Sequence, residues 1–319
     1  MTRLRAAVVQ AETPSDLTDG LSRTGVLVQE AAAKGAELVV FPEAWLSGYP
    51  AWLDNCRDAA LWDHAPVKRV YARMVENSVA VPGDACTALA RIARESGVTL
   101  VMGVNERVEA GPGRGTLYNA VLTYGPEGDL LNHHRKLLAT YSERMVWGHG
   151  DAHGLRAVPT RAGECSVRVG ALICWEHWMP LSRQALHESG EDVHVALWPT
   201  VHEMHQVASR QYAFEGRCYV LAAGSLMRAA ALPAELEPHP GKVSDGDQWV
   251  LRGGSAIIGP DGAYLAEPVY DTATTIMADL DLARLTEERL TLDVTGHYAR
   301  RDLFDFRVAS RERPRPDIP

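Results

Sequence analysis

The sequence predicts a single α/β domain in which helices cover β-sheet from the outside. Short apolar runs alternate with amphipathic segments along almost the whole chain, and no linker-like change in composition interrupts them. A length of 319 residues permits one large domain or two modest ones. The first unit is a strand over 6–10, a helix over 17–34 closed by Gly35, and a strand over 37–41.

The later segments continue this alternation. The stretch 45–75 is aromatic and irregular, as functional loops are, and its part over 67–75 is amphipathic enough for a helix. A surface loop rich in proline, glycine and acids is expected over 232–247. We expect further helices over 84–95, 182–189, 202–217 and 282–290, and strands over 99–104, 169–173, 193–197, 219–223 and 275–280.

Two hairpins of similar composition lie far apart in the chain. One spans 118–134 around the turn Gly125-Pro126-Glu127-Gly128, and the other spans 255–269 around Gly259-Pro260-Asp261-Gly262. Their similarity suggests a fold of two similar halves. We place one domain at 1–309 and predict an extended or disordered tail over 310–319, which holds three prolines and mixed charge.

Composition argues against several classes of protein. The net charge is −9 without a basic block, so nucleic acid is not an expected partner. The five cysteines are widely spaced without a CxxC, which argues against a disulfide framework and a zinc site. No apolar run is long enough for a signal peptide or a membrane span. We therefore expect no membrane partner and a cytoplasmic location, and the absence of a glycine-rich phosphate loop argues against nucleotide binding.

Cys174 is the first candidate for chemistry. It directly follows the apolar strand over 169–173, and a helix can start at Pro180. A thiol at the end of a buried strand is held rigidly and faces backbone N–H groups, which suits a nucleophile. A lone cysteine in such a place is more often a small buried apolar residue, so this interpretation depends on two distant stretches.

Those stretches supply Glu43 and Lys136. Glu43 follows a buried strand, where partial desolvation would raise its pKa and make it a usable base; the alternative is an acid at a helix N-terminus. Lys136 ends the first hairpin and would stabilise developing negative charge; the alternative is a solvated surface group. Glu143 could orient that lysine, or it could be a loop acid paired with Arg144.

Three histidines raise other possibilities. His177 lies three residues after the cysteine, so a Cys–His pair is conceivable, although the two side chains need not converge on a strand-to-helix turn. His202 and His205 share a helical face and could ligate a metal, but their spacing is one residue short of the zincin pattern. We expect these two to be a solvated or wall-forming pair.

Three motifs resemble the catalytic blocks of the nitrilase, or carbon–nitrogen hydrolase, superfamily. They are Phe41-Pro42-Glu43-Ala44, His134-Arg135-Lys136-Leu137 and Cys174-Trp175-Glu176, and further similarity lies at 140–148, 213–217 and 293–300. The Cys-Trp-Glu triplet and the segment Gly-His-Tyr-Ala-Arg over 296–300 look like the nitrilase branch. His177 stands where many relatives have asparagine, which bears on substrate preference.

The resemblance implies a four-layer α-β-β-α sandwich and assigns the roles. Cys174 would be the nucleophile, Glu43 the general base and Lys136 the electrostatic stabiliser, while Glu143 matches the second glutamate of the family. The implied reaction hydrolyses an organic nitrile to the carboxylic acid and ammonia through a thioimidate and a thioester, without a metal or organic cofactor. Relatives form dimers and often spirals, so we expect a homo-oligomer.

Alternatives remain within and beyond this family. An amidase or a cyanide-hydrolysing member would use the same residues, and a non-catalytic assembly protein could keep the same fold. Aromatic side chains are expected to wall an apolar substrate pocket, which favours aromatic or arylaliphatic nitriles; core packing would explain some of them equally well. They are Tyr49, Trp52, Trp62, Trp175 and Trp198.

Overall fold

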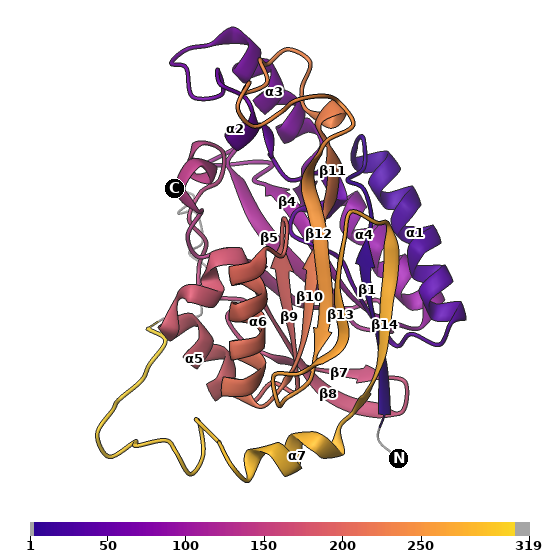
Figure 1. Cartoon of the computed structure of the whole chain (residues 1–319), viewed down its shortest axis with the longest axis vertical. Helices are drawn as coiled ribbons and strands as arrows, with labels where there is room; N and C mark the ends of the chain where they lie inside the picture. The colour runs from indigo at the N-terminus through magenta and orange to yellow at the C-terminus, as the bar shows by residue number, and fades with distance from the viewer. Residues whose placement is uncertain (1–2, 310–319) are drawn as a thin grey trace.

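The computed structural model describes residues 3–309, and in them two seven-stranded sheets pack face to face between two layers of helices. Figure 1 shows α1 (Leu17–Ala33) and α4 (Asp84–Ser96) on one side of the sheets, with α5 (Pro180–Glu188) and α6 (Glu203–Gly216) on the other. This arrangement confirms the expected α-β-β-α sandwich. The tail predicted at 310–319 lies outside the described residues.

The strands form two groups of seven. The first sheet contains β1 (Arg3–Gln10), β2 (Leu38–Val40), β3 (Val79–Ala80), β4 (Thr99–Arg107), β5 (Leu117–Tyr124), β6 (Leu130–Arg135) and β14 (Thr274–Asp281). The second contains β7 (Val158–Ala162), β8 (Cys165–Ile173), β9 (Val193–Trp198), β10 (Tyr219–Gly224), β11 (Leu226–Arg228), β12 (Trp249–Ile258) and β13 (Tyr264–Tyr270). The remaining helical segments are α2 (Trp52–Asn55), α3 (Ala65–Glu76), α7 (Ala283–Arg289), η1 (Trp45–Ser47), η2 (Tyr141–Met145), η3 (Cys174–Trp178) and η4 (Ala229–Ala231).

Both sheets repeat one pattern of pairing. In the first, the parallel strands β1, β2 and β4 continue into the antiparallel hairpin of β5 and β6, while β14 lies antiparallel on the other side of β1. In the second, β8, β9 and β10 are parallel and continue into antiparallel β12 and β13, while β7 lies antiparallel to β8. The expectation of two similar halves, based on the two hairpins, is therefore confirmed.

Strand β2 illustrates why these apolar runs are strands of a covered sheet. Leu38 and Val40 join a core cluster that includes β8 of the opposite sheet, whereas Val39 and Phe41 pack with residues of α1 and α4. Both faces of the strand are buried, so its sequence is uniformly apolar rather than alternating. The chain then reaches Glu43 without leaving the interior.

Several strands are longer than predicted. Strand β8 begins at Cys165, four residues before the predicted start, because β7 pairs with its first half; β7 contains Pro159 and forms an edge strand, where proline is tolerated. Strand β12 begins at Trp249, six residues before the start of the hairpin predicted over 255–269. None of the helices within residues 3–309 is long and apolar enough to cross a bilayer.

Gly103, in the middle of β4, allows a close approach of the Glu43 segment. A Cβ atom added there would lie 2.1 Å from the Pro42 carbonyl oxygen and 2.7 Å from the Ala44 nitrogen. We predict that Gly103→Ala lowers the free energy of unfolding by about 1–3 kcal/mol and displaces the carboxylate of Glu43. Urea unfolding and an activity assay would measure both effects.

The matched control is Gly25→Ala on α1, where the new Cβ meets only Ile92 Cδ1, at 4.0 Å. Replacing a helical glycine without a clash should stabilise the fold by about 0.4–1 kcal/mol. Equal unfolding midpoints for the Gly103 variant and the wild type would contradict the close approach.

Candidate active site

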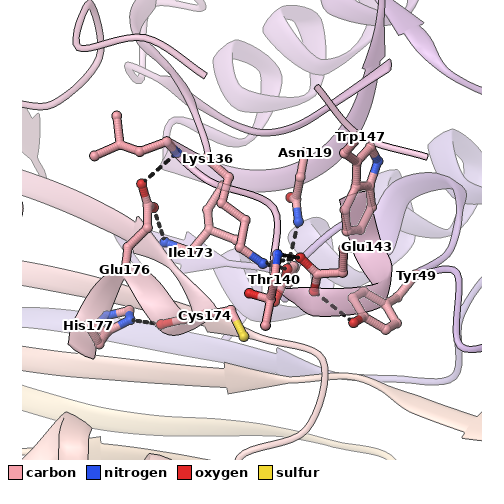
Figure 2. Close-up of polar contacts among 12 residues, drawn as sticks. Tyr49, Asn119, Lys136, Thr140, Glu143, Trp147, Ile173, Cys174, Glu176 and His177 are labelled. Carbon is pink, nitrogen blue, oxygen red and sulfur yellow. Dashed lines mark hydrogen bonds and ion pairs between the residues drawn. The ribbon is translucent and has the colours of Figure 1, made fainter. Parts of the chain in front are cut away.

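The four residues that sequence analysis singled out for catalysis lie close together and are buried. Figure 2 labels three of them, Lys136, Glu143 and Cys174. Lys136 Nζ donates to Glu43 Oε1 at 3.0 Å and to Glu143 Oε2 at 2.6 Å. The sulfur of Cys174 and one oxygen of each glutamate lie within 4.8 Å of one another. The segments that follow β2, β6 and β8, together with η2, therefore bring a thiol, two carboxylates and an ammonium group close together.

Glu43 is held at the turn that follows β2. It is fully buried, and the next residue, Ala44, has a φ of 48°, a left-handed conformation that turns the chain sharply. Asn119 Nδ2 donates to Glu43 Oε1 at 2.6 Å. Burial raises the pKa of Glu43 to about 7, opposed by the positive charge of Lys136 and reinforced by the negative charge of Glu143. A carboxyl with this pKa can act as a base near neutral pH.

Glu143 lies in the first turn of η2 with both oxygens engaged. Its Oε2 accepts from the Thr140 N–H at 2.7 Å as well as from Lys136, and its Oε1 accepts from the Tyr49 hydroxyl at 2.8 Å. Arg144 donates to a backbone carbonyl instead, so the alternative of a Glu143–Arg144 pair is wrong.

Lys136 is almost completely buried between these two carboxylates. Burial alone would lower its pKa, but the negative charge of Glu43 and of its other acidic neighbours raises it above the ordinary value. The ammonium therefore stays charged. Glu43, Glu143 and Cys174 form the one group of three or more His, Cys, Asp or Glu residues within residues 3–309 whose spacing would suit a metal ion. The ammonium of Lys136 binds both of these carboxylates and supplies a positive charge there.

Cys174 has a φ of 53°, which is unusual for a residue with a side chain and marks the abrupt change from β8 to η3. Burial raises the pKa of the thiol well above its ordinary value, as does the charge of Glu43. Lys136 and a hydrogen bond from the Trp175 N–H oppose this shift. The resting sulfur is a neutral thiol, and it needs a base to become a nucleophile.

Glu176 links the segment after the lysine to the strand before the nucleophile. Its Oε2 accepts from the backbone N–H of Ile173 at 2.7 Å (Figure 2). Its Oε1 accepts from the backbone N–H of Leu137 at 2.9 Å, and both oxygens lie 3.0 Å from His134 Nε2. The contacts with Ile173 and His134 are buried, and the contact with Leu137 is partly buried. Sequence analysis quoted Glu176 only as part of a motif. An acid two residues after the nucleophile, on a turn between buried elements, is the signal that could have found this role.

Asn105, Asn119 and Trp147 were also missed. Asn105 joins two loops, since its amide donates to the Gly48 carbonyl at 2.8 Å and its oxygen accepts from Trp147 Nε1 at 3.0 Å. The Trp147 ring lies 5.9 Å from Lys136 Nζ and faces the site. Both asparagines interrupt apolar strands, and a polar residue inside such a strand is the available sequence signal.

The aromatic residues predicted for a pocket lie in different places. Tyr49 reaches the catalytic cluster and, with Trp52, lines a cavity of about 450 Å³. Trp175 follows the nucleophile and is half exposed, whereas Trp198 is fully buried with its ring stacked between those of His177 and His205. Trp62 is 98% exposed and covers nothing within residues 3–309.

The histidines do not act as alternative partners of the thiol. His177 Nδ1 contacts the backbone oxygen of Cys174 and its Nε2 contacts His194, so neither nitrogen is available to the sulfur. His205 Nδ1 bonds the Thr200 carbonyl, and its ring packs against Trp198. His205 therefore forms part of an aromatic wall.

Comparison with known proteins agrees with this geometry. The model of the carbon–nitrogen hydrolase family matches residues 5–289. The chain is 38% identical over 313 residues to an aliphatic nitrilase of Sinorhizobium fredii, covering 97% of this chain and 96% of that protein. It is 34% identical over 321 residues to an arylacetonitrilase of Trametes versicolor, covering 98% of each.

Solved structures show the same fold at lower identity. A carbon–nitrogen hydrolase from Helicobacter pylori superposes with a TM-score of 0.71 at 17% identity, covering 95% of this chain and 97% of that one. The Nit3 protein of Saccharomyces cerevisiae gives 0.70 at 18% identity, covering 93% and 97%. The chain belongs to the carbon–nitrogen hydrolase family and is a hydrolase acting on carbon–nitrogen bonds.

Proposed function

We propose that the protein is a nitrilase, which converts an organic nitrile and two waters to a carboxylic acid and ammonia. The observation that carries this proposal is a buried cluster in which the Cys174 sulfur lies within 4.8 Å of oxygens of Glu43 and Glu143, the two carboxylates that bind Lys136. The full-length relatives of the chain include nitrilases. The site holds a nucleophile, a base near neutrality and a fixed positive charge, which are the three requirements of the reaction.

The first half of the reaction forms a covalent adduct. Glu43 takes the thiol proton as the sulfur of Cys174 attacks the nitrile carbon. The nitrile nitrogen gains negative charge, which Lys136 and the Trp175 N–H stabilise, and then accepts the proton to give a thioimidate. Because the pKa of the thiol is raised, proton transfer has to accompany the attack rather than precede it.

The second half uses two waters. The first adds to the thioimidate carbon, and the tetrahedral adduct expels ammonia to leave a thioester. A second water, deprotonated by Glu43, attacks the thioester and releases the carboxylic acid, while the proton returns to the sulfur of Cys174. Glu143 holds Lys136 against Glu43 throughout, through its contact of 2.6 Å with the ammonium.

An amidase or a cyanide hydrolase is the second candidate, because the same four residues can act on a carbonyl carbon or on hydrogen cyanide. One relative, from Lupinus angustifolius, is named a bifunctional nitrilase/nitrile hydratase. A purely structural role is disfavoured, since the catalytic cluster is complete. The cavity lined by Tyr49 and Trp52 supports aromatic or arylaliphatic nitriles as substrates, because the hydroxyl of Tyr49 binds the catalytic residue Glu143. Trp175 and Trp198 are not part of the lining of this cavity.

Self-association and location belong to the same proposal. Helices α5 and α6 expose apolar side chains, and an uncovered face of this kind suits a second copy of the chain. They are Leu181, Met204, Val207 and Phe214. We infer a homo-oligomer, a dimer or a larger spiral, built from one domain spanning 1–309. All five cysteines are unpaired, which supports a reducing, cytoplasmic environment.

We predict that Cys174→Ala lowers ammonia release from nitriles by on the order of 10⁴-fold or more, because no other group can form the adduct. The assay is a panel of aromatic, arylaliphatic and small aliphatic nitriles with their matching amides. Cys218→Ala, which removes another buried cysteine, is the control and should stay active. Turnover of amides alone would favour the amidase. Turnover of aliphatic nitriles alone would refute the aromatic preference.

The pKa of Glu43, raised to about 7, predicts the pH profile. The base works when ionised, so kcat/KM should fall as the pH drops below about 7. The Asn119 hydrogen bond favours the ionised form, so Asn119→Ala should move this acid limb upward by about one pH unit.

Asn132→Ala removes a buried asparagine of β6 that lies outside the site and should leave the limb in place. A profile that is flat from pH 5 to 8, or a limb that moves downward in the Asn119 variant, would count against Glu43 as the base.

The oligomer can be tested on α6. Phe214→Asp should reduce the mass measured by light scattering, since a buried charge opposes association. Val26→Asp changes an exposed apolar residue of α1, in the opposite helix layer, and should leave the mass unchanged. A wild-type protein that elutes as a monomer would exclude the assembly.

A further inference from the structure

A line of buried polar side chains runs from the nucleophile into the second sheet. His177 Nδ1 lies 2.7 Å from the Cys174 carbonyl oxygen (Figure 2). His177 Nε2 lies 2.9 Å from His194 Nε2, and His194 Nδ1 lies 2.9 Å from Glu191 Oε2. The three side chains are at most 2% exposed, so water does not compete for these contacts. None of them has a role in the reaction described above.

The contacts determine where the protons are. A carbonyl oxygen only accepts, so His177 Nδ1 carries a proton. A carboxylate also only accepts, so His194 Nδ1 carries one. Between the two Nε2 atoms exactly one further proton is required, because two lone pairs would repel at 2.9 Å and two protons would clash. The two rings therefore share three N–H protons and carry one positive charge.

The surroundings place that charge on His194. Burial lowers the pKa of His177 well below its ordinary value, as does the neighbouring His194. Burial alone would raise the pKa of Glu191, but His194 and His187 bring it to about 2, so this carboxylate is ionised beside His194. Tyr212 also donates to Glu191, and its ring stacks on that of His194 at 3.7 Å.

The far end of this line is one specific peptide group. The carbonyl that accepts from His177 belongs to Cys174, and the N–H of the same peptide belongs to Trp175 and is directed at the sulfur. A hydrogen bond to the oxygen of a peptide polarises it and strengthens its N–H as a donor. That N–H is the backbone donor to the charge that develops in the reaction.

We propose that Glu191, His194 and His177 form a charge relay that orients and polarises the peptide between Cys174 and Trp175. The relay lets the Trp175 N–H stabilise the thiolate and the anionic intermediates more strongly than an ordinary peptide does. The three side chains are positioning residues, since none touches the substrate. The kinetic part of this inference rests on the proposed nitrilase activity.

Two pairs of variants separate the links of the relay. His177→Asn keeps a donor at the Nδ1 position, while His177→Leu removes it. His194→Gln keeps a neutral donor at the Nε2 position, while His194→Phe keeps only the ring shape. The loss of one oxyanion donor costs about 10²–10³ in kcat, so a weakened donor should cost about ten-fold in the Leu and Phe variants and less in the Asn and Gln variants. KM should change less than about two-fold, because ground-state binding is not involved.

A second measurement needs no substrate. The rate at which iodoacetamide alkylates Cys174, followed by mass spectrometry between pH 6 and 10, reports how well the thiolate is stabilised. The rate at a given pH should fall in the order wild type, His194→Gln, His194→Phe. If His177→Leu or His194→Phe does not fold, the rates of His177→Asn and His194→Gln relative to the wild type still test the relay.

Asn132→Ala is the control here too, because the Asn132 amide donates to the carbonyls of Gly154 and Arg156 and to none of the three relay side chains. It should match the wild type in both measurements. Folded His177→Leu and His194→Phe proteins with unchanged kcat and alkylation rate would overturn the relay, as would a parallel rise of KM without a fall in kcat. If the wild type hydrolyses no nitrile but the alkylation rates still fall in the order wild type, His194→Gln, His194→Phe, the proposed nitrilase activity is refuted and the relay is supported.

Discussion

The ammonium of Lys136 between the carboxylates of Glu43 and Glu143 is the interaction on which the site depends. Two buried carboxylates at this separation would repel each other and lose their hydration, and one of them would take up a proton. The ammonium compensates both through contacts of 3.0 and 2.6 Å. It also leaves Glu43 with a pKa of about 7, so this carboxyl group can both lose and take up a proton near neutral pH. The balance of three charges thus produces the base.

The balance in turn requires that two sheets pack correctly. Glu43 and Lys136 follow strands of the first sheet, whereas Cys174 follows β8 of the second. Glu176 connects the two sheets, because its carboxylate accepts hydrogen bonds from the N–H of Leu137, after β6, and from the N–H of Ile173, in β8. The same few residues therefore hold the reacting groups in register and satisfy polar groups that would otherwise be buried without partners.

Much of the fold was predictable because its signals are local. Each apolar run with flanking glycine or proline became a strand, and the two similar hairpins revealed the repeated half. Glu43 and Cys174 could be found because each follows such a run, whereas Lys136 was found at the end of the first hairpin and Glu143 through the resemblance to the family. The partners of these residues could not be found in this way. Whether Glu143 meets Arg144 or Lys136 depends on the path of η2, and the contact of Glu176 with Leu137 depends on which strands of different sheets become neighbours.

The histidine relay shows the same limit more sharply. His177 and His194 are 2.9 Å apart only because β8 and β9 are adjacent and parallel, and a histidine in an apolar strand resembles a core residue when it is viewed alone. Sequence spacing suggested a pair of His177 with the thiol. The left-handed turn at Cys174 instead presents a carbonyl to the imidazole and leaves the sulfur on the other side.

The division of the reacting groups between the two repeated halves has a consequence for the nascent chain. During synthesis, the segments that carry Glu43 and Lys136 leave the ribosome before β8 and Cys174 have been made. Neither half alone contains a complete set of reactive groups. Catalysis therefore requires the two halves to dock, and an incompletely folded polypeptide carries the thiol without the base and the ammonium group that act on it.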